Sequence, residues 1–136
     1  MRDGDQKMAQ ENTVAVINSN EDIVEAIQLI LADEGYHSVG AHVVDFKKGR
    51  KDFVTFCKEH NPQVIIFDIA PPYEENWTFL QLIKNAKEVE GRRFIITTTN
   101  KGILEKFVGK TDAIEIVGKP FDMEEIVTTV KKKLKS

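Results

Sequence analysis

The sequence has little of what marks secreted, membrane-spanning or nucleic-acid-binding proteins. Its single cysteine, Cys57, excludes an internal disulfide and is typical of a reducing compartment. The longest apolar runs are far too short to span a bilayer, and residues 1–11 are polar, unlike a signal peptide. A formal net charge of −3 gives no electrostatic reason to expect binding to nucleic acid or to an anionic membrane. These absences predict a cytoplasmic protein that binds neither nucleic acid nor a membrane.

The remaining composition is that of one globular domain. The chain has 136 residues, of which 41% are hydrophobic and 30% are charged, so it can bury one hydrophobic core. No internal repeat or low-complexity tract interrupts it. We expect residues 1–11 to form a disordered tail and residues 12–136 to form a single domain.

The most informative stretch is Gln63-Val64-Ile65-Ile66-Phe67-Asp68, four apolar residues that run into a carboxylate. Such a run is typical of a parallel strand that is buried on both faces. The Asn-Pro pair before it ends the preceding helix, and Pro71-Pro72 follows it. Asp68 is therefore expected at the carboxyl end of a central strand, which is the edge of an open α/β sheet where ligands bind.

Strands and helices alternate along the rest of the chain. Helix-type apolar spacing separates the strands, and one helix is expected from about Gly49. Five βα units with right-handed crossovers predict an α/β, flavodoxin-like (βα)5 three-layer sandwich with the parallel sheet order 2-1-3-4-5. The five expected strands cover residues 13–17, 36–44, 64–68, 94–98 and 113–117.

Three of these strand ends carry polar groups that can meet at one edge of the sheet. Asp68 ends the third strand, Thr98 ends the fourth, and Gly118-Lys119-Pro120-Phe121 follows the fifth. A carboxylate can accept a phosphoryl group, and an ammonium and a hydroxyl can hold phosphoryl oxygens. Spacing alone leaves a second interpretation equally open, namely a structural ion pair between Asp68 and Lys119.

These residues resemble the receiver domain of two-component response regulators, over nearly the whole of residues 13–134. The resemblance is carried by the strand that ends in Asp68 with Pro72 four residues later, and by the Gly118–Phe121 motif. It implies that Asp68 is the phospho-acceptor, Thr98 the switch hydroxyl and Lys119 the phosphate-contacting lysine, with a cis peptide between Lys119 and Pro120. Neighbouring threonines leave open whether Thr97 or Thr98 is the switch residue.

Two positions depart from the family pattern. Receivers carry an acidic pair after the first strand that holds Mg²⁺ together with the acceptor, and this chain has Asn18-Ser19 there. Because Mg²⁺ prefers charged oxygen ligands, Asp68 remains the one expected carboxylate ligand and Mg²⁺ binding should be weak or absent. The family's switch aromatic is replaced by Ile116, which has no ring to reorient. Phosphorylation and its relay to the surface should both be impaired.

The resemblance implies a stand-alone receiver, a non-enzymatic phosphorelay protein that acts by protein–protein interaction. Its partner would be a histidine kinase, a phosphotransfer protein or another signalling protein, and it could form a homodimer through its fourth helix, fifth strand and fifth helix. The alternative is a pseudo-receiver adaptor that works without phosphorylation. A more remote alternative is a flavodoxin-like flavin- or nucleotide-binding enzyme, which needs a phosphate loop that the acidic stretch of residues 18–22 does not resemble.

Overall fold

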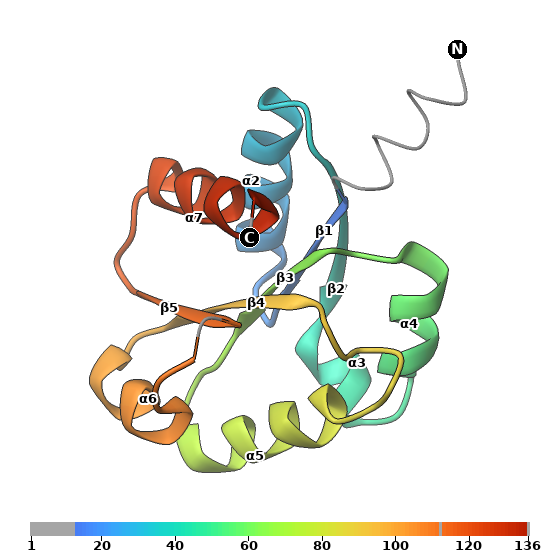
Figure 1. Cartoon of the computed structure of the whole chain (residues 1–136), viewed down its shortest axis with the longest axis vertical. Coiled ribbons are helices and arrows are strands. Elements are labelled where there is room, and N and C mark those ends of the chain that lie inside the picture. Colours follow the sequence, from blue (N-terminus) through green and yellow to red (C-terminus); the bar gives the residue numbers. More distant parts are fainter. Residues whose placement is uncertain (1–12, 112, 136) are drawn as a thin grey trace.

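A computed structural model describes residues 13–111 and 113–135 (Figure 1). The expected tail, residues 1–11, lies outside the described residues, as does residue 12. In chain order the elements are β1 (Thr13–Asn18), α2 (Glu21–Asp33), β2 (His37–His42), α3 (Val43–Lys47), α4 (Phe53–His60), β3 (Val64–Asp68), α5 (Tyr73–Lys84), β4 (Arg93–Thr98), α6 (Lys101–Val108), β5 (Ile114–Gly118) and α7 (Met123–Lys135).

The strands form one parallel sheet in the order β2-β1-β3-β4-β5, which confirms the predicted topology. β1 and β3 are neighbours, so the point at which the strand order reverses lies between them. Parallel pairing brings all five carboxyl ends to one edge, where the ends of β1, β3 and β4 lie side by side.

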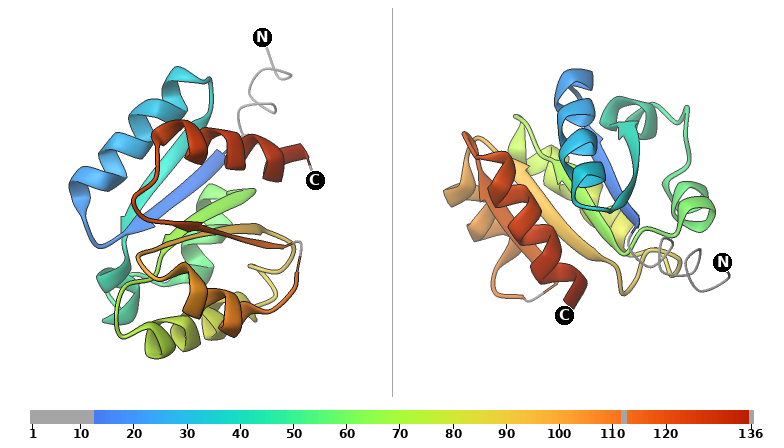
Figure 2. Two further views of the ribbon diagram at one scale, coloured as in Figure 1. Left: turned by 90° about the vertical axis from the view of Figure 1, so that its left-hand side faces the viewer. Right: turned by 90° about the horizontal axis from the view of Figure 1, so that it is seen from above.

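The sheet is covered by helices on both faces, and the pleat decides which side chain meets which layer. Alternate residues of a strand point to opposite faces, so Val64 and Ile66 join one cluster while Ile65 and Phe67 join the other. The first cluster packs under α2 and α7, and the second under α3, α4, α5 and α6 (Figures 1 and 2). This is the predicted three-layer sandwich.

The segment after β2 differs from the prediction. Residues 36–44 were expected to be extended and a helix was expected from Gly49, but β2 ends at His42, α3 follows at once, and α4 begins only at Phe53. The reason lies in Phe46, which is buried and makes edge contacts with the rings of Phe53 and Phe56 at centroid distances of 5.2 and 5.4 Å. A helical turn at this position places Phe46 in the core.

Asparagine and aspartate side chains begin three of the helices. The carboxamide of Asn20 accepts the N–H groups of Asp22 and Ile23 at the start of α2. Asp52 caps α4 and Asn100 caps α6 in the same manner. Each cap satisfies backbone donors that have no partner inside the helix.

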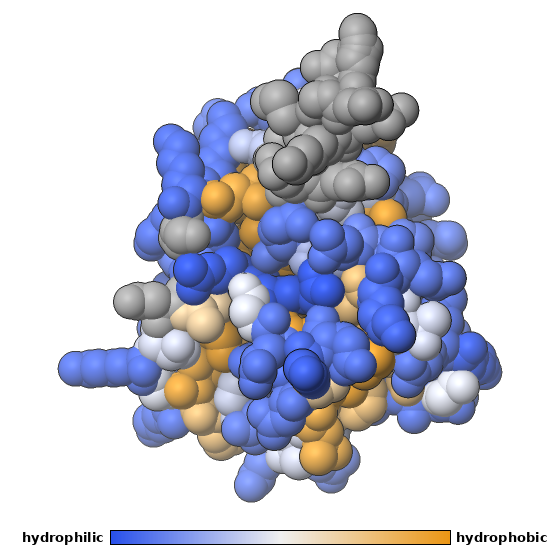
Figure 3. All heavy atoms as spheres, turned by 45° about the vertical axis from the view of Figure 1, so that its right-hand side comes forward, coloured by the Kyte–Doolittle hydropathy of each residue, from blue (hydrophilic) through white to orange (hydrophobic). Residues whose placement is uncertain are grey.

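Charged and polar residues cover most of the face shown in Figure 3, with hydrophobic residues visible between them. Across residues 13–111 and 113–135, none of the helices combines the length and the apolar character needed to cross a membrane.

Gly40 of β2 supports the close packing of α2 on the sheet. A Cβ built at this residue would lie 2.6 Å from Cγ1 of Val24, which is buried. Gly40→Ala should therefore lower the free energy of unfolding by about 1–3 kcal/mol through overpacking. Gly102→Ala is the control, because a Cβ there meets only the Asn100 side chain at 3.8 Å, and it should stabilise α6 by about 0.5–1 kcal/mol.

Urea denaturation of both variants measures these changes. The cost of Gly40→Ala should largely disappear in a Val24→Ala background, since the obstructing methyl group is then absent. A cost that persists in that background would contradict the steric explanation.

Candidate functional site

The candidate site is built around one oxygen of Asp68, the last residue of β3. The Asp68 side chain is 4% exposed, and its Oδ1 lies 2.6 Å from Nζ of Lys119. The hydroxyl of Thr97 donates to the same oxygen at 2.7 Å. The structure thus brings together the predicted carboxylate and ammonium, with a hydroxyl from β4.

The second carboxylate oxygen of Asp68 differs from the first. Both described polar contacts of the Asp68 side chain go to Oδ1, and neither goes to Oδ2. No fully buried side-chain oxygen or nitrogen lacks a partner among the described residues, so Oδ2 is not sealed from solvent. One oxygen is therefore held by the protein, while Oδ2 has no described polar partner and keeps some contact with solvent, as a nucleophilic carboxylate needs.

The hydroxyl that meets Asp68 belongs to Thr97, whereas Thr98 was named as the switch residue. Asp68 is paired with Thr97 across β3 and β4, and paired residues of neighbouring strands point to the same face. Thr98 therefore points to the opposite face, where its buried hydroxyl accepts the N–H of Asn100 at 3.2 Å. Thr98 helps to shape the start of α6, and which threonine contacts a phosphoryl group stays a prediction.

Lys119 is positioned by the segment that follows β5. Its backbone N–H donates to the carbonyl oxygen of Thr98 at 2.7 Å, and its peptide bond to Pro120 is cis, as the resemblance implied. The lysine side chain is 29% exposed. Its ion pair with Asp68 is therefore partly screened by water, yet it supplies the positive charge that the buried carboxylate requires.

The residues at the expected metal position do not form a good Mg²⁺ site. Asn18 is buried at the end of β1, and its Oδ1 already accepts the N–H of Asn20 at 3.0 Å. Ser19 is exposed. Within the part of the chain that the structure describes, no three His, Cys, Asp or Glu side chains are grouped so that they could hold a metal ion. A single carboxylate that is already paired with a lysine gives Mg²⁺ little charge to bind.

Ile116 occupies the expected switch-aromatic position on β5, where it is half-buried and packs against the core under α3 to α6. Its neighbour Glu115 points to the other face and pairs with Lys132 and Lys133 of α7 at 3.1 and 3.5 Å. Burial by itself would raise the pKa of Glu115, but the two lysines outweigh it and hold that pKa below its usual value. This ion-pair group ties α7 to β5.

One further contact beside the site was missed at the sequence level. The hydroxyl of Tyr73, at the start of α5, lies 2.6 Å from Oγ1 of Thr99, just after β4. It joins the loop that follows Asp68 to the loop that precedes α6. The sequence contains no signal for it, because the two residues meet only through the pairing of β3 with β4.

The family comparison agrees with this geometry. The family model of the response regulator receiver domain matches residues 14–131. The chain belongs to the response regulator receiver domains. The comparison with curated proteins finds no match for the chain.

Solved receiver structures have the same fold at low sequence identity. The chemotaxis response regulator CheY4 of Vibrio cholerae is 22% identical, with a TM-score of 0.67 over 89% of this chain and 97% of that one. The receiver domain of the Francisella response regulator 1452 is 20% identical, with a TM-score of 0.69 over 91% and 97%. The receiver domain of a histidine kinase from Syntrophus aciditrophicus is 18% identical, with a TM-score of 0.70 over 91% and 90%.

Membership places the chain in two-component signalling. Receiver domains in general are signalling modules that interact with histidine kinases or phosphotransfer proteins, and they typically bind Mg²⁺ at the phosphorylation site. The matched range includes all of the expected site positions, Asn18, Ser19, Asp68, Ile116 and Lys119, whose roles stay predictions.

The contact between Thr97 and Asp68 predicts a specific energetic coupling. In a double-mutant cycle, Thr97→Val and Asp68→Ala should couple by about 1–2 kcal/mol, because the hydroxyl donates to a charged oxygen. Thr98→Val is the matched control and should couple to Asp68→Ala by less than about 0.5 kcal/mol. Urea unfolding of the single and double variants measures both values. Stronger coupling to Thr98 than to Thr97 would contradict the register described here.

Proposed function

We propose that this receiver acts through protein–protein contacts in a phosphorelay, with Asp68 as the phospho-acceptor position and with weak or absent Mg²⁺-dependent phosphorylation. The observation that carries the proposal is that Lys119 and Thr97 occupy Oδ1 of Asp68, while the described residues contain no group of three or more His, Cys, Asp or Glu side chains that could hold a metal ion. The site is therefore stabilised without a metal ion.

The chemistry open to Asp68 is attack by its outward oxygen. Oδ2 would form a bond to phosphorus while the bond from phosphorus to its carrier breaks, either a histidine nitrogen of a kinase or the acyl oxygen of acetyl phosphate. The transferred group carries its negative charge on three oxygens, and Lys119 and Thr97 are the cation and the donor that lie beside the carboxylate. Both would have to shift from Oδ1 towards those oxygens.

Weak phosphorylation follows from the charge balance of the site. Lys119 is the one cation paired with Asp68 among the described residues, and phosphoryl transfer in this kind of site depends on a metal ion to neutralise the additional charge. Asn18 offers a neutral oxygen that is already engaged with Asn20. These features also support the pseudo-receiver alternative, in which partners bind the unphosphorylated form.

The flavin- or nucleotide-binding alternative finds no support at β1 and α2. A phosphate would need free N–H groups at the start of α2, but Asn20 already accepts those of Asp22 and Ile23. Glu21 and Asp22 also add negative charge where the ligand would carry its own.

The partner surface that we propose is the face formed by α6, β5 and α7, which is turned to the viewer in the left panel of Figure 2. A groove of about 640 Å³ runs across it, lined by residues of both charges that include Lys101, Glu105 and Lys132 as well as the half-buried Ile116. Its mixed charge suits a partner, or a second copy of the chain, with complementary polar groups.

The metal proposal predicts a gain of function on restoring the acidic pair. Asn18→Asp with Ser19→Asp should increase Mg²⁺ affinity and the labelling of Asp68 by acetyl phosphate by at least about tenfold, because two carboxylates would join the acceptor. It should also lower the metal-free stability, since like charges would crowd one crevice. Amide chemical shifts measure Mg²⁺ binding, and intact-mass spectrometry measures labelling.

Gln81→Glu with Asn85→Asp is the matched control, because Gln81 on α5 and Asn85 directly after it are both exposed and the variant adds the same charge away from the site. Asp68→Asn should remove labelling in every background. Wild-type protein that labels as fully as the double variant, with the same Mg²⁺ affinity, would show that Asn18 suffices as a ligand and would overturn the proposal.

The partner surface predicts where amide shifts will change. Titration with a histidine phosphotransfer protein, or an increase in the concentration of the chain itself, should perturb residues 101–108 and 114–118 and leave α2 unaffected. Glu105→Lys on α6 should weaken the interaction by up to about tenfold. Glu25→Lys, the same charge change at an exposed residue of α2, should leave the interaction unchanged. Perturbation confined to α2 would refute the proposed face.

A further inference from the structure

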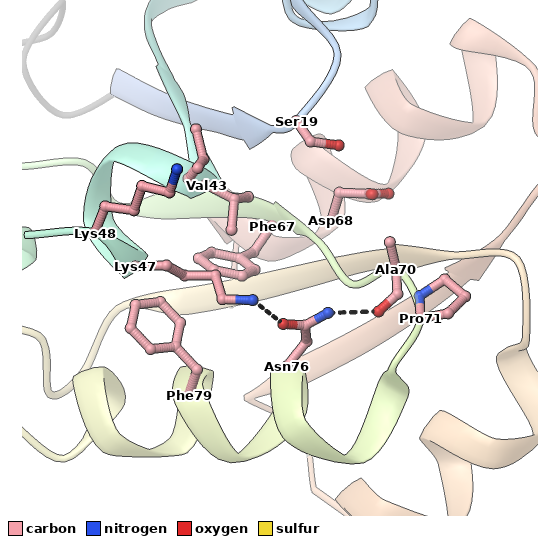
Figure 4. Close-up of a pocket in the computed structure, with 11 residues that line it drawn as sticks. Ser19, Val43, Lys47, Lys48, Phe67, Asp68, Ala70, Pro71, Asn76 and Phe79 are labelled. Carbon is pink, nitrogen blue, oxygen red and sulfur yellow. Dashed lines mark hydrogen bonds between the residues drawn. The ribbon is translucent and has the colours of Figure 1, made fainter.

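A pocket of about 500 Å³ lies beside Asp68 (Figure 4). It opens between α3 and α5, while Thr97 and Lys119 meet the carboxylate on the side of α2 and α7. Asp68 forms part of the pocket wall, and its carboxylate points away from the two lysines that line the far end. The pocket therefore adjoins the proposed phospho-acceptor site and shares Asp68 and Ser19 with it, and its volume is typical of small-molecule sites.

The wall of the pocket is mainly apolar. The rings of Phe67 and Phe79 form one side (Figure 4). Val43 and Val44 of α3 also line the pocket. Val44 is 38% exposed, which leaves a valine side chain open to solvent beside two aromatic rings. An apolar body of a few carbon atoms would cover this surface and displace water from it.

The polar side chains of the pocket include two lysines, together with Ser19, Asn76 and Asp68. Lys47 donates to Oδ1 of Asn76 at 2.6 Å, and Asn76 in turn donates to the carbonyl oxygen of Ala70 at 2.7 Å. The chain of two hydrogen bonds fixes the ammonium group of Lys47 beside the start of α5 (Figure 4). Lys48 lies beside it, and neither lysine has a carboxylate within ion-pair distance among the described residues.

These lysines leave the pocket with an excess of positive charge. Its one carboxylate, Asp68, is already neutralised by Lys119, and Lys47 contacts a neutral amide. Two uncompensated cations above an apolar floor match a ligand with an acidic group at one end and a short apolar body at the other.

We propose that this pocket binds a small organic acid, with its carboxylate or phosphate at Lys47 and Lys48 and its apolar body against Phe67 and Phe79. This second input goes beyond the proposed phosphorelay function and does not depend on it. The ligand would touch Ala70 and Pro71, in the loop directly after the acceptor strand. Binding of the ligand would therefore change the environment of the loop next to Asp68.

The test uses ring-bearing probes that differ in charge. Phenyl phosphate and phenylacetate should give saturable amide shifts in α3, in the loop of residues 69–72 and in α5, with dissociation constants on the order of 1 mM. Phenylacetamide, the neutral analogue of phenylacetate, should bind about tenfold more weakly than phenylacetate. The stronger of the two acids identifies whether a phosphate or a carboxylate is the preferred group.

Variants then assign the contacts. Lys47→Met and Lys48→Met should each weaken binding of the acids about threefold, and the double variant about tenfold, which is the range for exposed charge pairs. Lys58→Met, an equal charge change at an exposed residue of α4, is the control and should leave binding of the acids unchanged. Val44→Trp should abolish binding by filling the pocket without any change of charge. Thermal unfolding confirms that each variant is folded.

Three results would each overturn the proposal. The first is equal binding of phenylacetate and phenylacetamide, and the second is unchanged binding to the folded double lysine variant. The third is a set of shifts that lies on α6 and α7 instead of α3 and α5. Because every probe is tested without Mg²⁺ or acetyl phosphate, failure here leaves the phosphorelay proposal intact, and failure of Asp68 labelling leaves this one intact.

Discussion

The pleat of the central parallel sheet is the constraint on which both candidate sites depend. Residues of even number on β3 face α2 and α7, and those of odd number face α3 to α6. Asp68 therefore directs its carboxylate to Thr97 and Lys119, while Phe67 presents its ring to the opposite layer. Two adjacent residues of one strand thus serve two different environments, separated by the thickness of the sheet.

The charge balance at Asp68 explains how a receiver can be stable without an acidic pair. Three carboxylates in one crevice would repel one another and would require a bound cation. Here the neutral Asn18 caps the turn after β1, and the single carboxylate is matched by the single ammonium of Lys119. On the proposed function, the same neutral residues that would weaken Mg²⁺ binding would also remove the need for a metal ion to offset their charge.

The sequence predicted the sheet order and the positions of Asp68 and Lys119, because long apolar runs and strand ends are local signals. It did not settle Thr97 against Thr98, since the choice depends on the register of β4 against β3, which no local pattern encodes. The prediction extended the second strand over Val43 and Val44, the first two residues of α3, which are β-branched, and burial of Phe46 overrides that preference. The pocket beside α3 could not be predicted for the same reason.

The aromatic residues are divided between the two layers, and this division has an optical consequence. Trp77, the one tryptophan of the chain, is 7% exposed on α5 and belongs to the cluster under α3 to α6. Its emission therefore reports on that layer alone. Tyr36 packs against the other cluster, below α2 and α7. The second tyrosine, Tyr73, packs against the same cluster as Trp77, so only the tryptophan signal belongs to one layer. Comparison of Trp77 emission with the loss of total helicity therefore distinguishes cooperative unfolding, in which the two transitions coincide, from the loss of one helical layer at a time.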